Sequence, residues 1–300
     1  MASGVTGCYQ GAMPLLVPTG PNAEQITHWN EVSAPKWIRF QHVLDEQLGA
    51  LGRMAAERAA LRPGERVLDV GCGCGSTTLE LAMRVGREGS VVGIDVSTPM
   101  LERALECARA TDAANVVFWN ADAQTHPLPP AAFDLVYSRF GVMFFVDPAQ
   151  AFTNLGRALR PGGRVFFVCW QALERNPWMA VPMAVAAREI TFPPRPGPEA
   201  PGPFSLADPD RVRRILGDAG FRDVTLEGCE TMLAIGGGGT LDDAVEFLVD
   251  MGPTGVALRD AGPSARPRVV AAVKRALAPF HGPQGLRMNS AVWLVGARRS

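Results

Sequence analysis

The residues best suited to bind a ligand lie in one short segment of the chain. Residues 67–70 form an apolar run around Asp69, glycine then alternates with cysteine from Gly71 to Gly75, and a helical pattern follows. A buried strand that enters a tight glycine turn and then a helix N-terminus lets a ligand lie close against the backbone. A second apolar run, at 91–94, ends at Asp95, twenty residues after Gly75. An acid at the tip of the next parallel strand is placed to accept both hydroxyls of a ribose. These features indicate a cofactor that contains adenosine.

A dinucleotide is the first alternative for that cofactor. Its fingerprint needs Gly or Ala at the sixth position of G-x-G-x-x-G. Counted from Gly71 this position is Ser76, and counted from Gly73 it is Thr78, so neither count fits. Asp69 would also repel a pyrophosphate. A nicotinamide-dependent oxidoreductase is therefore disfavoured.

The same segment resembles the first motif of the class I S-adenosylmethionine (SAM) methyltransferases, and the chain is similar to the small-molecule members of ubiquinone and menaquinone biosynthesis. The resemblance implies that the glycine turn faces the methionine end of SAM and that Asp69 helps to hold its ammonium group. It also implies that Asp122 accepts the adenine amino group, that the backbone N–H of Ala123 meets the ring, and that the Ser138 carbonyl faces the methionine amine. Val96 and Met100 are available to pack on adenine. The expected cofactor-binding residues are Asp69, Gly71, Cys72, Gly73, Asp95, Val96, Met100, Asp122, Ala123 and Ser138.

The elements that must position these residues alternate between strands and helices. Apolar runs predict strands at 67–70, 91–95, 116–120, 135–138 and 164–170. Helices are predicted at 98–110, with Ser97 as the N-cap, and at 148–159, stopped by Pro161-Gly162-Gly163. Two late strands, at 224–235 and 291–297, suit the antiparallel hairpin that class I methyltransferases append. The expected class is α/β, a Rossmann-like doubly wound sheet of seven strands, mostly parallel with an antiparallel terminal hairpin, plus N-terminal helices and a helical cap.

Six consecutive segments are expected along the chain. Amphipathic helices are predicted within 34–61, one cap helix at 178–190, and two helices in the late insertion, the first capped by Thr240 and the second at 265–278. The segments are an N-terminal segment with lid helices at 1–62, a SAM-binding core at 63–170, a cap insertion at 171–204, a return of the core sheet at 205–239, a helical cap insertion at 240–282 and a final core strand at 283–300.

Composition restricts the partners and the compartment. The 300 residues carry a formal net charge of -1, which gives no electrostatic case for nucleic acid or an anionic membrane. Lysine occurs only at Lys36 and Lys274, and the Arg, Ala, Gly and Pro content suggests a GC-rich bacterial genome. The sequence has neither an 18-residue apolar span nor a signal-like N-terminus, so we expect a cytoplasmic protein without a membrane span. Paired Cys-x-x-Cys or matching His motifs are missing, so we expect reduced thiols and no metal. The oligomeric state is not determined by the sequence.

Methyl transfer from a sulfonium needs alignment more than acid–base chemistry, and a water-free pocket favours it. The general base, if one is needed, is not assigned; the candidates are His28, Glu174 and His281. The expected acceptor is a small, largely apolar, ring-containing metabolite methylated at oxygen, nitrogen or carbon. The alternative within the class is a methyltransferase acting on RNA or protein, and a SAM-binding protein without transferase activity has no feature in its favour. The expected residues around the acceptor are Trp29, Trp37, Met143, Phe144, Phe145, Trp178, Met179, Met183, Phe247 and Met251.

Overall fold

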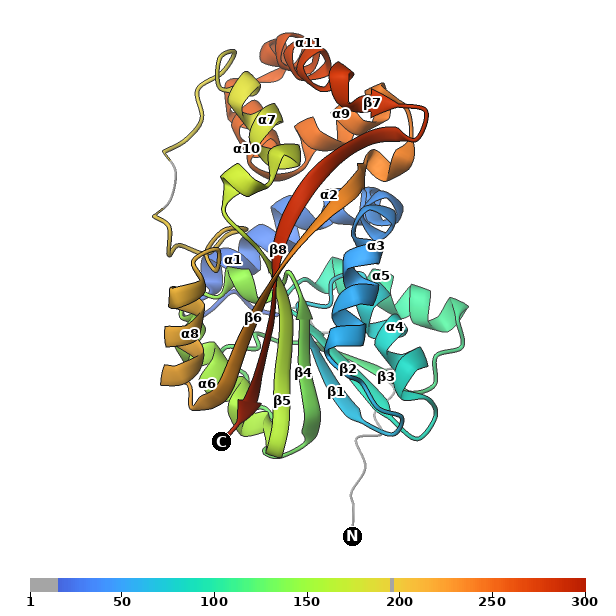
Figure 1. Ribbon diagram of the computed structural model, residues 1–300, viewed down its shortest axis with the longest axis vertical. Helices are drawn as coiled ribbons and strands as arrows, with labels where there is room; N and C mark the ends of the chain where they lie inside the picture. Colours follow the sequence, from blue (N-terminus) through green and yellow to red (C-terminus); the bar gives the residue numbers. More distant parts are fainter. Residues whose placement is uncertain (1–15, 195–196) are drawn as a thin grey trace.

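A single twisted sheet forms the centre of the computed structural model, which describes residues 16–194 and 197–300 (Figure 1). Residues 1–15 of the N-terminal segment expected at 1–62 therefore lie outside the described residues. The sheet order is β3-β2-β1-β4-β5-β8-β6, with β7 paired to β8. The parallel strands are β1 (Arg66–Val70), β2 (Ser90–Asp95), β3 (Val116–Asn120), β4 (Phe133–Arg139) and β5 (Leu159–Trp170). The antiparallel strands are β6 (Phe221–Ile235), β7 (His281–Gly282) and β8 (Gly285–Arg299).

The inner strands are apolar on both sides because helices cover both faces of the sheet. Val67 and Leu68 of β1 and Leu135 of β4 are fully buried. The helices α3 (Gln41–Arg58), α4 (Ser76–Val85) and α5 (Thr98–Ala110) lie on one face, and α6 (Pro148–Ala158) and α8 (Pro209–Asp218) lie on the other (Figure 1). The five parallel strands confirm the doubly wound α/β prediction, and β7 is an addition to the seven strands expected.

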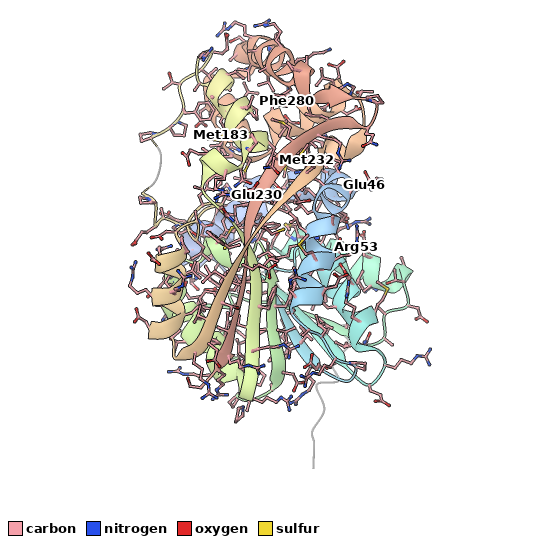
Figure 2. All side chains as sticks on the ribbon, in the orientation of Figure 1. Glu46, Arg53, Met183, Glu230, Met232 and Phe280 are labelled. Carbon is pink, nitrogen blue, oxygen red and sulfur yellow. The ribbon has the colours of Figure 1, made fainter. Side chains whose placement is uncertain are left out.

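The terminal hairpin continues beyond the sheet and carries the cap. Residues 230–235 of β6 pair with residues 286–291 of β8 above the carboxyl ends of the parallel strands. Met232 and Phe280 are exposed on this upper part (Figure 2). The cap helices gather at the same end and are α7 (Pro177–Ala186), α9 (Leu241–Asp250), α10 (Gly252–Ala261) and α11 (Arg266–Leu277) (Figure 1).

The late insertion contains three helices, so the prediction of two was wrong. Gly252 has φ +63° and starts α10 one residue after α9, and Gly262, with φ +82°, separates α10 from α11. Thr240 caps α9 as predicted, through a reciprocal hydrogen-bond pair with Asp243. The helix α7 ends at Ala186, before the predicted Ile190.

The N-terminal segment forms a helical lid between the sheet and the cap. It consists of α1 (Ala23–Thr27), a π-helical turn η1 (His28–Ser33) and α2 (Ala34–Arg39), and α3 follows after a break at Phe40. The 3₁₀ turns are η2 (Val142–Phe144), η3 (Leu173–Arg175), η4 (Gly236–Gly238), η5 (Pro263–Ala265) and η6 (Ala278–Phe280). In the part of the chain that the structure describes, no helix has both the length and the apolar character needed to cross a bilayer.

The predicted stop at Pro161-Gly162-Gly163 lies inside β5 instead of at the end of a helix. The helix α6 has already ended at Ala158, where Leu159 takes extended angles, and Gly162 has φ +76°. The difference arises because pairing of Leu159 with Phe133 begins the strand before the proline.

Candidate functional site

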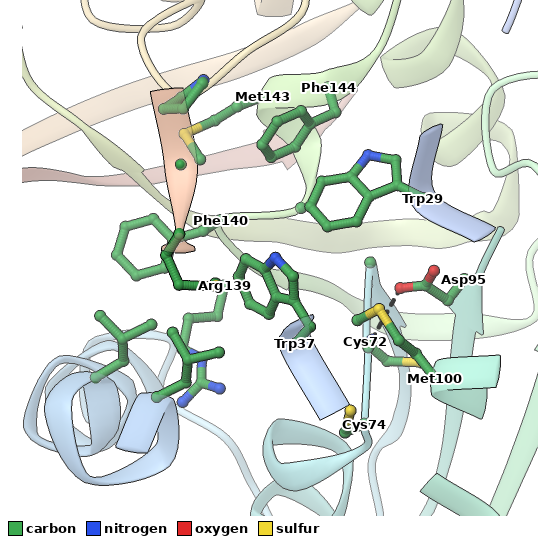
Figure 3. Close-up of a pocket in the computed structure, with 18 of the residues that line it drawn as sticks. Trp29, Trp37, Cys72, Cys74, Asp95, Met100, Arg139, Phe140, Met143 and Phe144 are labelled. Carbon is green, nitrogen blue, oxygen red and sulfur yellow. Dashed lines mark hydrogen bonds between the residues drawn. The ribbon is translucent and has the colours of Figure 1, made fainter. Parts of the chain in front are cut away.

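A cavity of about 260 Å³ lies at the carboxyl ends of β1, β2 and β4, under the lid and the cap (Figure 3). The glycine turn after β1 and the tip of β2 contribute Gly73 and Asp95 to its wall. The lid contributes Trp29 and Trp37, and the cap contributes Phe247 among others. This is the edge of an open parallel sheet at which ligands bind.

The glycine turn is held by direct backbone contact with the turn after β4. Gly71 has φ +69°, and a Cβ built on it would lie 2.7 Å from the Cα of Gly141. A Cβ on Gly141 would in turn lie 2.6 Å from the carbonyl oxygen of Val70. A Cβ on Gly73 would meet only the flexible end of Met100, so the positive φ of +54° is what favours glycine there.

The carboxylate of Asp95 holds the glycine turn through hydrogen bonds to the backbone. Its Oδ2 accepts from the Gly73 N–H at 2.8 Å and its Oδ1 from the Ser97 N–H at 2.9 Å. Burial raises the pKa of Asp95, and these backbone donors oppose that rise. Ser97 occupies the predicted N-cap position of α5, but its hydroxyl donates to the Trp29 carbonyl oxygen at 2.9 Å instead of capping the helix.

Asp122 joins the lid to the third strand end. Its Oδ2 accepts from Asn22 Nδ2 and Thr125 Oγ1, both at 2.8 Å, and its Oδ1 accepts from the Gln124 N–H at 2.9 Å. The lid is fixed further along by Asn30, whose Nδ2 donates to the Val96 carbonyl oxygen at 2.9 Å. The lid is therefore docked on the strand ends that were expected to hold adenosine.

Two of the expected cofactor residues, Asp69 and Ser138, do not line the cavity. Asp69 is 1% exposed and accepts from Thr78 Oγ1 at 2.7 Å. Ser138 Oγ donates to the Val70 carbonyl oxygen at 2.8 Å and accepts from the N–H of Gly141 at 3.2 Å. Both side chains therefore stabilise the turns after β1 and β4 without facing the cavity. The other eight expected cofactor residues all line the cavity.

The buried Asp69 carboxyl should make stability depend on pH. Burial raises its pKa from 3.8 to about 7, so the unfolded chain ionises near pH 4 and the folded chain only near pH 7. The folded state binds more protons in between, so stability falls as pH rises from about 4 to 7. Asp69→Asn should raise Tm by a few degrees at pH 8 and leave it unchanged near pH 4, as measured by thermal unfolding across pH. An equal effect at both pH values would contradict this ionisation.

All ten residues predicted around the acceptor line the cavity. Trp29 packs edge-on against Trp37 and Phe144, with ring centroids 5.6 and 4.9 Å apart (Figure 3). Phe140 was not predicted; it stacks on Trp170 at 4.2 Å and has φ +65°, a strained angle for a bulky residue. The part of the cavity beside the lid and the cap is therefore built from packed aromatic rings and Met side chains. We call it the upper part, and we call the part beside the glycine turn and Asp95 the lower part.

The three candidate bases lie outside the cavity lining. His28 Nε2 is 2.9 Å from Ser33 Oγ, and burial, with Arg259 and Lys36 nearby, lowers the pKa of its imidazole. Glu174 and His281 are both exposed. In this arrangement none of them reaches the cavity.

Sequence reasoning missed Arg139, which reaches the lower wall of the cavity (Figure 3). Its side chain is 16% exposed, and the closest carboxylate, that of Asp45, is 3.8 Å away. No hydrogen bond joins its guanidinium to any residue in the described ranges 16–194 and 197–300. Ser76 and Thr77, in the first turn of α4, line the same cavity, and no side chain caps that helix. The signal in the sequence was a lone arginine directly after the strand predicted at 135–138.

The thiols of the glycine turn should be chemically inert. Burial raises the pKa of Cys74 to about 12 and raises that of Cys72 well above its usual value, so neither forms the thiolate that reacts. Cys74→Ala should leave catalytic turnover within about twofold of wild type, and iodoacetamide at pH 8 should leave both thiols unlabelled by mass spectrometry. Strong inactivation by the substitution would instead indicate a role for the thiol. No group of three or more metal-ligating side chains occurs within the described residues.

Comparison with known proteins relates this geometry to one domain family. Residues 67–163 match the methyltransferase domain family. The chain is 36% identical over 117 residues to the aklanonic acid methyltransferase DauC of Streptomyces sp., covering 39% of this chain and 53% of that protein. It is 35% identical over 153 residues to the ubiquinone/menaquinone biosynthesis C-methyltransferase UbiE of Ectopseudomonas mendocina, covering 50% of this chain and 59% of that protein.

A solved structure shows the same fold over most of the chain. Phosphoethanolamine N-methyltransferase 2 of Haemonchus contortus, in complex with phosphomonomethylethanolamine and S-adenosylhomocysteine, aligns with a TM-score of 0.57 and 20% identity. The alignment covers 91% of this chain and 59% of that one. The chain spans about half the length of the curated relatives it matches.

Proposed function

We propose that this chain is a class I SAM-dependent methyltransferase that transfers the methyl group of SAM to a small, largely apolar molecule. The match of residues 67–163 to the methyltransferase domain family and the similarity to UbiE support this proposal. The observation that carries the proposal is the two-part cavity. A glycine turn and the half-buried Asp95 form one part, and aromatic and Met side chains form the other.

The residues of the lower part fit SAM. An ionised carboxylate offers about four lone-pair sites, and the two backbone bonds of Asp95 use one on each oxygen. Both oxygens can therefore still accept a ribose hydroxyl. Val96 and the buried Met100 supply apolar surface for the adenine. Three donors already bind the Asp122 carboxylate, which leaves it one site for the adenine amino group.

We assign the carboxylate of the methionine part to Arg139. An arginine that is largely buried without a hydrogen-bonded acceptor is costly unless a ligand pairs with it. The first turn of α4 lies in the same wall and adds the positive end of its helix dipole. Asp45, which accepts from Ser76 Oγ at 2.7 Å, is available beside it for the ammonium group. Asp69, which the resemblance places at the ammonium group, does not line the cavity.

Removing the charge of Arg139 should weaken SAM binding at least about tenfold, because a charge-assisted bond contributes roughly 1.5–3 kcal/mol. Arg139→Met should leave 5′-methylthioadenosine unaffected, since that compound has no amino-acid group. Calorimetry with both ligands measures the difference. Arg84→Met is the matched control, because Arg84 lies on α4 outside the cavity lining and pairs with Glu80. Equal losses for both ligands would remove Arg139 from this role.

The chain itself contributes alignment and water exclusion. SAM, when bound, supplies a methyl group that is already activated for displacement. The aromatic and Met side chains keep water from the acceptor end without offering a competing nucleophile. Among the described residues, the titratable side chains that line the cavity are Asp45, Cys72, Cys74, Asp95, Asp122 and Arg139. All belong to the lower part, so no titratable side chain of the lining lies at the acceptor end among the described residues.

The size and lining of the cavity support a small acceptor over a macromolecule. Arg139 is the one arginine in the lining that the structure describes, whereas an RNA groove would need several. Calorimetry against SAM, S-adenosylhomocysteine and NAD⁺ is the first test, and a turnover assay follows release of S-adenosylhomocysteine. We expect the first two ligands to bind and NAD⁺ not to bind. Binding of NAD⁺ alone would overturn the proposal.

A further inference from the structure

Two buried hydrogen-bond donors in the cavity wall have no acceptor within residues 16–194 and 197–300. They are Nε2 of Gln47 and Nε1 of Trp178. Gln47 is 2% exposed on α3, and Trp178 is the second residue of the cap helix α7. A buried donor without a partner carries the full cost of its desolvation, so such groups need an explanation.

The orientation of the Gln47 amide is set by its neighbour. Its Oε1 accepts from the Gly236 N–H at 3.4 Å, so the oxygen faces that backbone donor and the NH₂ group is the free end. Glutamine NH₂ and the indole N–H can both only donate. Both unpaired donors therefore need a hydrogen-bond acceptor as their partner.

The ring of Trp178 is held in place by other aromatic residues. Its centroid lies 5.3 Å from that of Trp170, which is itself stacked on Phe140. Such packing fixes a donor before any ligand arrives, which lowers the entropy cost of binding. Met179 and Met183 follow Trp178 along α7 and line the same cavity. Their flexible side chains let the wall adapt to an entering molecule.

From these observations we propose that the methyl acceptor is a neutral ring molecule bearing carbonyl oxygen, for which Gln47 and Trp178 supply the hydrogen-bond donors. A carbonyl oxygen accepts hydrogen bonds and donates none, so it suits either donor. The surrounding wall is apolar and carries no charge at this end, so an anionic or cationic group would be desolvated without a partner. This inference rests on the proposed function and narrows its substrate class.

The test compares two probes that differ only in the oxygen, 2-acetylnaphthalene and 2-ethylnaphthalene. Equilibrium dialysis measures their binding to the full chain saturated with S-adenosylhomocysteine. Wild type should bind the ketone at least about tenfold more tightly, because an unpaired buried donor gains a partner. At least one of Gln47→Met and Trp178→Phe should lower that ratio at least threefold while leaving 2-ethylnaphthalene binding unchanged. Trp119→Phe is the matched control, because Trp119 on β3 lies outside the cavity lining, and it should keep the wild-type ratio.

The outcomes separate this inference from the function on which it rests. If S-adenosylhomocysteine does not bind, the proposed function fails. If it binds and the ratio of ketone affinity to hydrocarbon affinity is the same in wild type, Gln47→Met and Trp178→Phe, the two donors do not bind the carbonyl oxygen. The inference is then overturned. Unchanged hydrocarbon binding in each variant shows that the cavity is still folded, and the two variants test the donors separately.

Discussion

Asp95→Ala should weaken SAM binding by at least about tenfold. Two hydroxyl-to-carboxylate bonds are charge-assisted, each contributing roughly 1.5–3 kcal/mol net. The substitution also frees the N–H of Gly73, which Asp95 holds at 2.8 Å, so the glycine turn loses an anchor. The sheet should persist, because Asp95 is the last residue of β2. Calorimetry with SAM, together with thermal unfolding, measures both effects.

Asp122→Ala provides the comparison for that result. Its carboxylate holds Asn22 of the N-terminal segment and turns the chain at Thr125, so its loss should loosen the lid more than it weakens adenine binding. We expect a smaller loss of SAM affinity than for Asp95→Ala. A larger loss would show that the division of roles between the two acids is wrong.

Gly71→Ala should abolish SAM binding and lower the free energy of unfolding by roughly 2–5 kcal/mol. The positive φ costs an alanine about 1–2 kcal/mol, and forcing a methyl group into a packed contact costs about 1–3 kcal/mol. The contact here is backbone, because the new Cβ would lie 2.7 Å from the Cα of Gly141. Relief would require the turns after β1 and β4 to move apart.

Gly64→Ala is the matched control. Gly64 has φ +82° and nothing within 4 Å of its would-be Cβ, so this variant isolates the cost of the backbone angle. Urea unfolding of both variants gives the two costs, and their difference measures the contact between the turns. If Gly64→Ala and Gly71→Ala lose equal stability and Gly71→Ala still binds SAM normally, the close approach of the turns does not shape the site.

The positions of the parallel strands along the chain and the glycine turn with Asp95 were readable from the sequence because they depend on local patterns. A strand covered on both faces needs a largely apolar run, as at residues 91–94, and a turn with positive φ needs glycine at Gly71 and Gly73. Large apolar side chains around Phe144 and Trp178 could be assigned to a pocket as a class, because the chain places them after strand ends. Their roles toward an acceptor stay predictions.

Tertiary structure decided the polar part of the site. Asp69 and Arg139 lie near the ends of neighbouring strands, yet only Arg139 reaches the cavity, because Thr78 of α4 covers Asp69. Gln47 could be identified as a candidate donor only from the contact between α3 and η4. In this contact its Oε1 accepts from the Gly236 N–H, which leaves the NH₂ group unpaired. The third cap helix likewise depends on packing of the late insertion. Local sequence determines which residues end a strand or turn the chain, whereas the partner of a buried polar group depends on contacts between residues far apart in the sequence.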